Sequence, residues 1–226
     1  MTWLADTVGA TVIPMSTNIR RFNSDFASWA AVGFGTGTVS TALCLSHRIS
    51  RVEIASAGLG VSYGLEGSHP CLDHNFSTEA VAVQNGEPGL SRFEKTRIIA
   101  DWPEALFVVR PCCYKTIPQE TINCGACEKC IRTMLALVAL GKLGESPAFP
   151  FNDLKPATLE PLLIERELDV MYYEQCIDAL IAAERSDLVA TVQRKIGEYR
   201  KRERRKSALK LIKTAIPVRA WRTSSR

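Results

Sequence analysis

This chain has no apolar run long enough to cross a membrane. A membrane helix needs about 20 consecutive apolar residues, and the longest apolar run, near Met134–Leu140, is much shorter. The segment Met1–Ala10 contains Asp6 and lacks the basic region and long apolar stretch of a secretory signal. Internal repeats are absent as well. Because 46% of the 226 residues are hydrophobic, we expect a soluble, cytoplasmic protein with an ordinary core.

Basic and acidic residues are unevenly distributed. The chain carries 28 Lys and Arg against 24 Asp and Glu. Between Arg194 and Arg226 lie 13 of these basic residues and 2 of the acidic ones, so the remainder has 15 and 22, a net charge of −7. A basic tail on an acidic body is typical of a segment that contacts nucleic acid, anionic lipid or an acidic partner. A solvated helix end explains the same composition, since basic composition alone specifies no partner.

Cysteine is frequent, and its positions are clustered. Eight cysteines, an even number, are typical of disulfides when the protein is secreted, but no secretory signal opens this chain. Five of the eight lie between Cys112 and Cys130. In a cytosolic protein such a cluster indicates a metal site rather than disulfides.

Short apolar segments alternate with helical patterns in the first part of the chain. This alternation predicts an α/β fold with βαβ units around a mostly parallel sheet. The expected helices are Trp3–Val8, Thr38–His47 and Leu90–Ala100. The expected strands are Thr11–Met15, Val52–Ser56, Val81–Val83 and Leu106–Val109.

The remainder of the chain is predicted to be helical. A helix over Glu128–Leu140 has Gly141 as its stop signal, and Pro147, Pro150 and Pro156 mark a linker. Later helices are expected over Thr158–Glu167 (broken near Pro161), Val170–Glu184 and Asp187–Lys206. We therefore divide the chain into an α/β domain (1–146), a helical extension (147–206) and a basic tail (207–226).

The spacing of four cysteines predicts one bound zinc ion. Zinc prefers tetrahedral sulfur ligands, and thiolates at C-x2-C spacing can wrap one ion. Two of the cysteines lie at the start of the helix expected over Glu128–Leu140, whose dipole favours the thiolate form. Four thiolates leave no open position for a substrate, so the zinc would be structural. The predicted ligands are Cys113, Cys124, Cys127 and Cys130.

Three alternatives to this assignment stay open. Cys112 adjoins Cys113, and the spacing does not distinguish them; we choose Cys113 and leave Cys112 as a buried or spare thiol. The spacing C-x2-C-x2-C is also compatible with an iron–sulfur cluster. Four unrelated buried cysteines are the third alternative.

The residues around the cysteines resemble one enzyme family. The runs Arg110-Pro-Cys-Cys-Tyr-Lys and Asn123-Cys-Gly-Ala-Cys-Glu-Lys-Cys-Ile-Arg-Thr are similar to the end of the 7-cyano-7-deazaguanine synthase-like proteins, of the PP-loop ATP pyrophosphatase superfamily. Weaker matches are Leu90-Ser-Arg-Phe-Glu-Lys-Thr-Arg and Gly67-Ser-His-Pro-Cys-Leu-Asp. The likeness covers roughly Thr11–Leu143.

This resemblance implies a fold and a chemistry. The fold is a Rossmann-like parallel sheet of the adenine nucleotide alpha hydrolase-like kind that binds ATP. The chemistry is adenylation of a carboxylate or carbonyl oxygen on a small-molecule or nucleobase-like substrate, with release of pyrophosphate. Adenylation turns a poor leaving oxygen into a good one, and backbone amides at a helix N-terminus can hold the phosphates.

One motif of the superfamily is missing. The phosphate loop Ser-Gly-Gly-x-Asp-Ser does not occur in the chain, and no Walker sequence replaces it. The Gly-rich segment Gly33–Gly37 is interpreted as a loop into a tightly packed helix rather than a phosphate cradle. The chain is therefore expected to be a truncated product, one part of a split enzyme or a non-catalytic relative.

The resemblance and the positions of several residues suggest ligand-binding roles. His69 and Asp73 could orient a substrate or a Mg²⁺ ion, with Ser68 as a loop donor, although the same three residue types form caps and turns. Arg92 and Lys95, three residues apart on one helical face, could meet phosphate oxygens. Alternatively, they form solvated ion pairs. Ser56 ends an expected strand, where open α/β sheets bind ligands.

Two classes of function follow. The first is an ATP-dependent adenylating ligase or amidation-type enzyme, with structural Zn²⁺ and with ATP and Mg²⁺ as further cofactors. The second is a non-catalytic, zinc-stabilised binding module whose basic helical tail contacts RNA or a protein partner. A homodimer is compatible with either.

Overall fold

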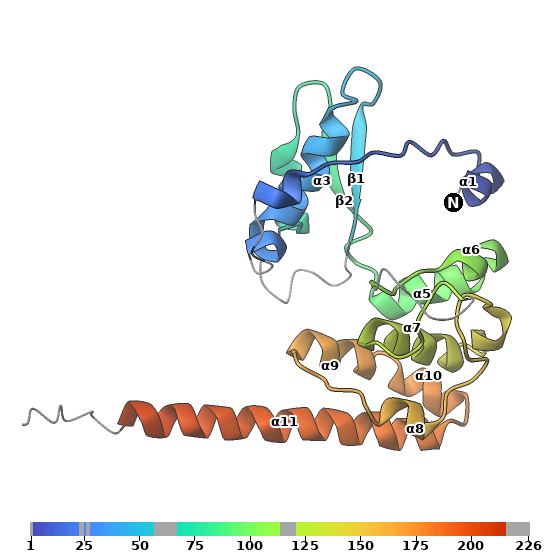
Figure 1. Ribbon diagram of the computed structural model, residues 1–226, viewed down its shortest axis with the longest axis vertical. Helices are drawn as coiled ribbons and strands as arrows, with labels where there is room; N and C mark the ends of the chain where they lie inside the picture. Colours follow the sequence, from blue (N-terminus) through green and yellow to red (C-terminus); the bar gives the residue numbers. More distant parts are fainter. Residues whose placement is uncertain (1, 23–24, 26–27, 57–66, 114–120, 216–226) are drawn as a thin grey trace, which may run out of the picture.

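The computed structural model describes residues 2–22, 25, 28–56, 67–113 and 121–215. Figure 1 shows a small sheet with its helices at one end, a group of helices at the other, and a long C-terminal helix that projects sideways. The protein is a mixed α/β molecule, as expected. Within the described residues the sheet has two strands, so the predicted four-stranded sheet is not formed there.

The two strands are parallel neighbours. β1 (Arg51–Ala55) pairs with β2 (Ala82–Gly86) in a register that places Ile54 opposite Asn85. α3 (Phe34–Leu43) packs on one face, where a small core contains Val39, Ile54 and Val83. Between the strands in sequence lie α4 (Pro70–Asp73) and η4 (His74–Phe76). Both strands lie close to their predicted positions.

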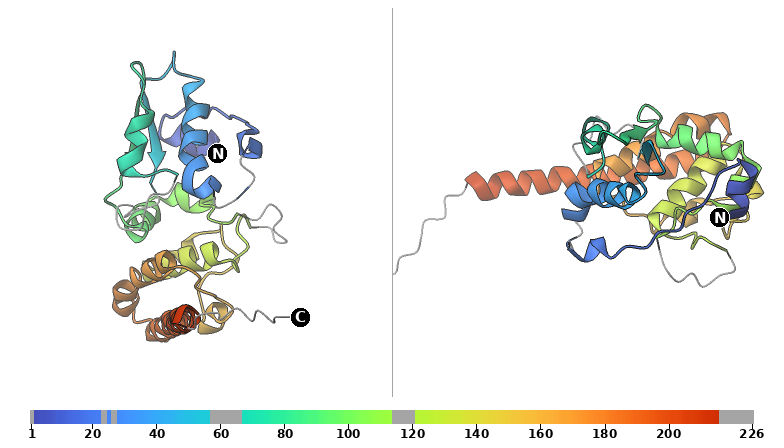
Figure 2. Two further views of the ribbon diagram at one scale, coloured as in Figure 1. Left: turned by 90° about the vertical axis from the view of Figure 1, so that its left-hand side faces the viewer. Right: turned by 90° about the horizontal axis from the view of Figure 1, so that it is seen from above.

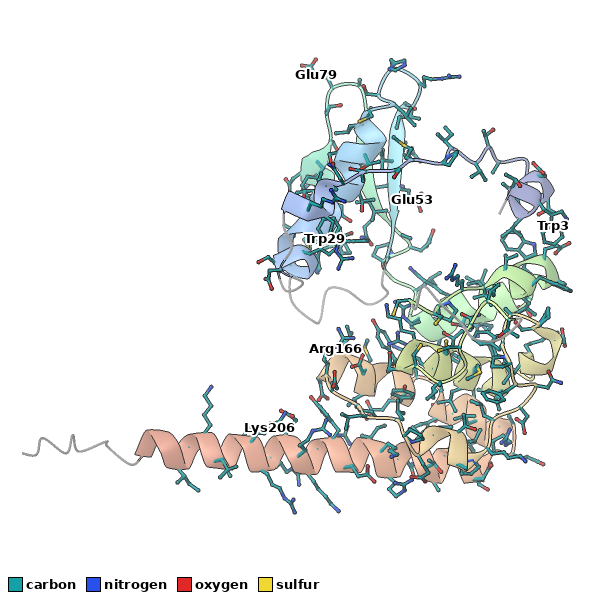
Figure 3. All side chains as sticks on the ribbon, in the orientation of Figure 1. Trp3, Trp29, Glu53, Glu79, Arg166 and Lys206 are labelled. Atoms are coloured by element: carbon teal, nitrogen blue, oxygen red, sulfur yellow. The ribbon has the colours of Figure 1, made fainter. Side chains whose placement is uncertain are left out.

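The Gly-rich segment belongs to a packed helix. A π-helical turn, η2 (Trp29–Gly33), leads directly into α3. A Cβ atom on Gly33 would meet Trp29 Cε3 at 2.8 Å, and one on Gly37 would meet Trp29 Cη2 at 2.9 Å (Figure 3). Glycine is required because the indole ring lies against the helix backbone. The segment is thus part of the packed helix itself and not the loop before it that was expected.

Two predicted strands are wrong. Thr11–Met15 has no regular structure, and three of its apolar side chains, Val12, Ile13 and Met15, are 41%, 57% and 45% exposed. Leu106–Val109 is largely the end of helix α6 (Pro103–Val108). Proline at the first helical position favours a helix start because it lacks an N–H that would go unbonded there. This signal outweighs the short apolar run that predicted a strand.

Helices α5 and α6 join the sheet to the helical part. α5 (Arg92–Ala100) follows β2 and packs against α7 (Glu128–Ala139). The N-terminal helix α1 (Thr2–Thr7) lies near α6 (Figure 1). Trp3 and Phe107 line one surface hollow there. Between α1 and η2 lies the short helix η1 (Ile19–Phe22). The expected helices at Trp3–Val8, Thr38–His47 and Leu90–Ala100 thus correspond to α1, α3 and α5.

The main hydrophobic core surrounds α7. Nine of its twelve residues are buried, among them Met134 and Leu135, because other helices cover it on several sides (Figure 2). The predicted helix at Thr158–Glu167 is only α8 (Pro156–Leu159), and the predicted helix at Val170–Glu184 is divided in two. The remaining elements are η5 (Leu143–Glu145), α9 (Glu167–Glu174), α10 (Ile177–Ala182) and α11 (Ser186–Ala215).

α11 is packed in its first half and projects in its second. Its buried side chains, among them Leu188 and Ile196, end at Tyr199. The helix continues past Lys206, its predicted end, into the predicted basic tail (207–226) as far as Ala215 (Figure 1). Residues 216–226 of that tail lie outside the described residues. None of the helices in the described part of the chain is both long and apolar enough to span a membrane.

Candidate metal centre and strand-end pocket

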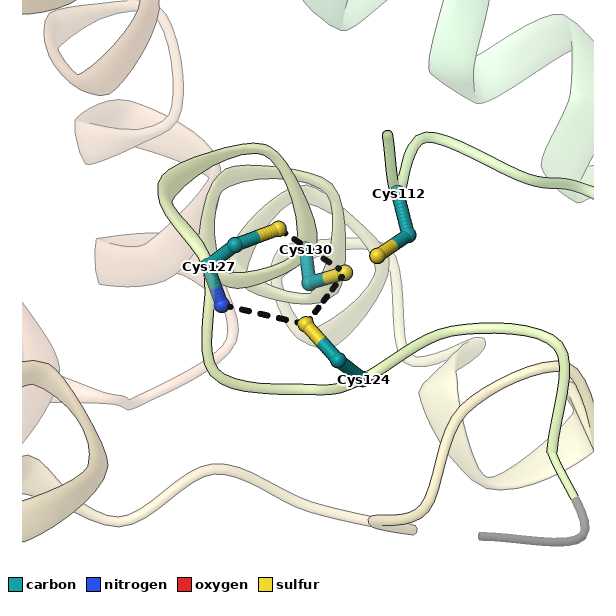
Figure 4. A group of neighbouring side chains, drawn as sticks. All are labelled: Cys112, Cys124, Cys127 and Cys130. Carbon is teal, nitrogen blue, oxygen red and sulfur yellow. Dashed lines mark hydrogen bonds between the residues drawn. The ribbon is translucent and has the colours of Figure 1, made fainter. Parts of the chain in front are cut away.

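Four cysteine sulfurs converge at the start of α7. They come from the segment after α6, from the loop before α7 and from the first turn of the helix (Figure 4). The four sulfur atoms all lie within 4.8 Å of one another. The fourth member is Cys112 and not the predicted Cys113, whose side chain is exposed. The group is Cys112, Cys124, Cys127 and Cys130.

The correction from Cys113 to Cys112 has a simple physical reason. Adjacent side chains of a non-helical segment point to different sides, so only one of two neighbouring cysteines can face the other three. Cys112 is 6% exposed and faces the core, whereas Cys113 faces solvent. The spacing before Cys124 allowed either residue, and no feature of the sequence told them apart.

The sulfur positions fit a single ion. A tetrahedral site with Zn–S bonds of about 2.3 Å has sulfur atoms about 3.8 Å apart. Cys130 Sγ lies 3.7 Å from Cys124 Sγ and 3.4 Å from Cys127 Sγ. An iron–sulfur cluster holds its thiolates farther apart because several iron atoms separate them. The four cysteines could therefore hold one metal ion such as zinc.

Local hydrogen bonds favour a thiolate at Cys124. Burial opposes its ionisation, but the N–H groups of Ala126 and Cys127 and the thiols of Cys112 and Cys127 outweigh burial and lower the pKa of Cys124 to about 7. Burial raises the pKa of Cys127 and, more strongly, that of Cys130. A cation among these sulfurs would offset that cost, since metal binding deprotonates thiols.

The loop before α7 turns at Gly125. This residue has a φ of +68°, and a Cβ atom there would meet Pro150 Cγ at 2.5 Å. The segment containing Pro150 and Phe151 thus covers the loop from outside. A glycine at this position allows both the turn and the close contact.

The predicted group Ser68, His69 and Asp73 does come together, but as a cap. Asp73 is fully buried and accepts hydrogen bonds from Ser68 Oγ (2.9 Å), the His69 N–H (3.0 Å) and Asn85 Nδ2 (2.7 Å). His69 Nδ1 accepts the N–H of Cys71 at the start of α4. Both Asp73 oxygens accept hydrogen bonds, so the carboxylate ties α4 to β2.

Lys95 and Ser56 meet at the carboxyl end of the sheet. Lys95 Nζ donates to the carbonyl oxygens of Ser56 (3.1 Å) and Gly86 (3.4 Å), which follow β1 and end β2. A pocket of about 330 Å³ opens beside them. Burial, and then repulsion from Arg92, lower the pKa of Lys95 below its usual value, and Glu87 partly opposes this. The pocket is lined by Glu53, Ala55, Ser56, Gly86, Glu87, Leu90, Lys95, Ile98 and Ile99.

Arg92 does not share this pocket. Its guanidinium lies 5.0 Å from the centre of the Tyr172 ring, and that of Arg132 lies 4.3 Å from the same ring. Arg132 also forms ion pairs with Glu128 (3.4 Å) and Asp169 (3.8 Å). Arg92 therefore helps join α5 to α9 through cation–π contact. It does not line the pocket beside Lys95, although its charge repels the Lys95 ammonium.

Sequence reasoning missed one buried polar residue at the metal group. Asn123 is fully buried and bonds to three main-chain groups, one of them the N–H of Cys112. An asparagine directly before a metal-binding cysteine could have indicated a residue that positions the ligands, because this side chain readily bonds to backbone groups.

Comparison with known proteins gives no match. No protein-family model, no curated protein and no solved structure is similar to this chain at a significant level.

Proposed function

We propose that this chain belongs to an ATP-dependent adenylating ligase or amidation-type enzyme of the 7-cyano-7-deazaguanine synthase-like group. In this proposal Cys112, Cys124, Cys127 and Cys130 hold a structural zinc ion. We also propose that β1 and β2 belong to a Rossmann-like sheet of the kind found in that group.

The observation that carries the proposal is the pocket beside Lys95. Open α/β sheets bind their ligands outside the carboxyl ends of parallel strands, and this pocket lies at that edge of β1 and β2. Among the described residues, Lys95 uses two of its three hydrogens on the carbonyl groups of Ser56 and Gly86. The third is available to a phosphate or carboxylate oxygen of a ligand.

The pocket combines charge with apolar surface. Leu90, Ile98 and Ile99 form an apolar side on which a planar ring could lie, while Glu53 and Glu87 offer acceptors to ring N–H groups. The metal group lies elsewhere, at the start of α7, and four thiolates fill its coordination shell. The zinc would therefore hold the helices beneath the sheet, and the pocket residues would bind the ligand.

Binding of ATP tests this proposal directly. Removing a charged hydrogen bond costs about 1.5–3 kcal/mol, so Lys95→Met should weaken ATP binding by about 10- to 100-fold in equilibrium titration. Arg97→Gln, an exposed substitution on the same helix, is the matched control and should leave the Kd unchanged. Absence of ATP binding, or equal affinity in Lys95→Met, would contradict the proposal.

A second candidate function rests on the second half of α11. From Arg204 to Ile212 every side chain is exposed, and four of these residues are basic (Figure 3). Lys206 Nζ pairs with Glu203 Oε1 of the same helix at 2.7 Å. A projecting basic helix of this kind could bind the phosphates of RNA, with the zinc-stabilised body as its support. The four residues are Arg204, Arg205, Lys206 and Lys210.

Salt dependence of RNA binding tests this alternative. Each phosphate contact to a single strand contributes about −0.7 to the slope of log K against log salt. Changing the four basic residues to Gln should reduce the slope by up to about 3. A control with the same loss of charge changes four exposed basic residues of the body, and it should behave as wild type. The control residues are Arg48, Arg51, Arg97 and Lys129. Equal slopes in both variants would reject the alternative.

A further inference from the structure

Three of the four cysteines are positioned by local structure, and the fourth is not. Cys124, Cys127 and Cys130 lie within one loop and the first turn of α7, where Gly125 makes the turn. Cys112 comes from a separate segment that follows α6. A metal centre with four ligands therefore needs a contact that holds the Cys112 segment against the loop.

We propose that Asn123 is this positioning residue, and that its buried amide sets the place of Cys112 in the metal centre. The proposal rests on the zinc site described above. Asn123 Oδ1 accepts the N–H of Cys112 at 3.2 Å. Its Nδ2 donates to the carbonyl oxygen of Val109 at 2.8 Å and to that of Ala148 at 2.9 Å.

Each polar group of the Asn123 side-chain amide has a hydrogen-bond partner. An asparagine amide has two N–H donors and one carbonyl oxygen, and here both donors meet carbonyl groups while the oxygen meets an N–H. The side chain has no exposed surface, so no water competes for these bonds. One residue thus joins the segment of Cys112, the loop of Cys124 and the segment that covers Gly125 from outside.

Residues that orient metal ligands affect affinity as well as stability. Loss of such a partner usually lowers metal affinity by about 10- to 100-fold. Asn123→Ala would leave the Cys112 N–H and two carbonyl groups without their partner. We expect zinc affinity, measured by competition with a chromophoric chelator, to fall by about 10- to 100-fold. The thiolate-to-metal absorption of the Co²⁺-substituted protein should weaken toward that of Cys112→Ser.

Ser146→Ala is the matched control. Ser146 is also buried, and its hydroxyl donates to the carbonyl oxygen of Leu106 at 2.7 Å, so it ties the same covering segment to α6. Among the described residues, its hydroxyl bonds to no metal-binding cysteine and to no residue of the loop before α7. Loss of the Ser146 hydroxyl should lower thermal stability but leave zinc affinity and the Co²⁺ spectrum near those of wild type. A folding defect alone would affect both variants similarly.

A double-mutant cycle separates positioning from general stability. In the Cys112→Ser background, Asn123→Ala should cost little further zinc affinity, because the thiolate that it positions is already absent. Asn123→Ser keeps a short hydroxyl group, so its zinc affinity should lie between those of wild type and Asn123→Ala. If Asn123→Ala does not fold, Asn123→Ser takes its place in the cycle. The proposal is wrong if Asn123→Ala lowers zinc affinity equally in the wild-type and Cys112→Ser backgrounds. It is also wrong if Asn123→Ala lowers zinc affinity no more than Ser146→Ala does. Absence of metal from the wild-type protein would instead reject the zinc site itself.

Discussion

Gly125 is the residue at which the loop before α7 reverses direction over the metal group. It has a left-handed backbone conformation, and Pro150 and Phe151 pack against the place where a side chain would start. Gly141, which follows α7, has the same φ of +68°, but no neighbouring atom lies within 4 Å of the position that a Cβ atom would take there. The two glycines therefore share one backbone requirement and differ in packing.

This pair gives a prediction at the residue scale. Gly141→Ala should lower the free energy of unfolding by about 1–2 kcal/mol, the cost of a left-handed non-glycine residue. Gly125→Ala should cost about 1–3 kcal/mol more, because the new methyl group overlaps Pro150 and Phe151. Urea denaturation of the metal-loaded proteins measures both. Equal losses in the two variants would show that the covering segment does not press on the loop.

Residue identities predicted the metal site only in part. The spacing of Cys124, Cys127 and Cys130 is short enough for local geometry to bring the sulfurs together, so three ligands followed from sequence. Cys112 and Cys113 are adjacent, and which of the two is the fourth ligand depends on which side of an irregular segment faces the core. That side is set by long-range contacts such as those of Asn123, which sequence reasoning did not include.

α5 is the element that connects the proposed ligand pocket to the helical core. Its first turn carries a capping box in which Ser91 Oγ accepts the Glu94 N–H and Glu94 Oε2 accepts the Ser91 N–H. Lys95, in the next position, faces the strand ends. Because the cap fixes where α5 begins, it also fixes the reach of the Lys95 ammonium.

The capping box gives a prediction at the scale of the element. Ser91→Ala should destabilise the protein by about 1 kcal/mol in urea denaturation, whereas Ser207→Ala, exposed on α11, should change stability by less than about 0.5 kcal/mol. Hydrogen bonds from Ser91 lower the pKa of Glu94 from its usual 4.5.

The pH dependence of this cap follows from the direction of that shift. A carboxyl whose pKa is lower in the folded state stabilises the protein above its unfolded pKa, and the contribution disappears as pH falls through the folded value. The stability difference between wild type and Glu94→Gln should therefore be present at pH 7 and shrink below pH 4.5. A difference that stays constant down to about pH 2 would exclude a role for the Glu94 carboxylate.

Elements with strong local signals were predictable, and short apolar runs were not. α7 has one long amphipathic pattern and a glycine stop, so it was placed within a residue at its end. Thr11–Met15 and Leu106–Val109 are four- to five-residue runs that fit a strand or a buried helix segment equally. The first contains Pro14 and stays exposed, and the second continues a helix that Pro103 begins.

At the scale of the whole molecule, two cores of different size are connected through α5. The sheet has a small core around Val39, Ile54 and Val83, while the helical part has a large one that includes Cys112 and Cys130. The metal group thus belongs to the larger core and links the segment after α6 to α7 (Figure 4). The α/β class was predictable from alternation, but the number of strands depends on tertiary packing.

Metal content of the purified protein tests the central claim most directly. Wild type and Cys113→Ser, prepared under reducing conditions without chelator, should each contain about one zinc per chain by elemental analysis, and Cys112→Ser should contain much less. Absence of stoichiometric metal from the wild type, iron in place of zinc, or loss of zinc from Cys113→Ser but not from Cys112→Ser would contradict a zinc centre built on Cys112, Cys124, Cys127 and Cys130.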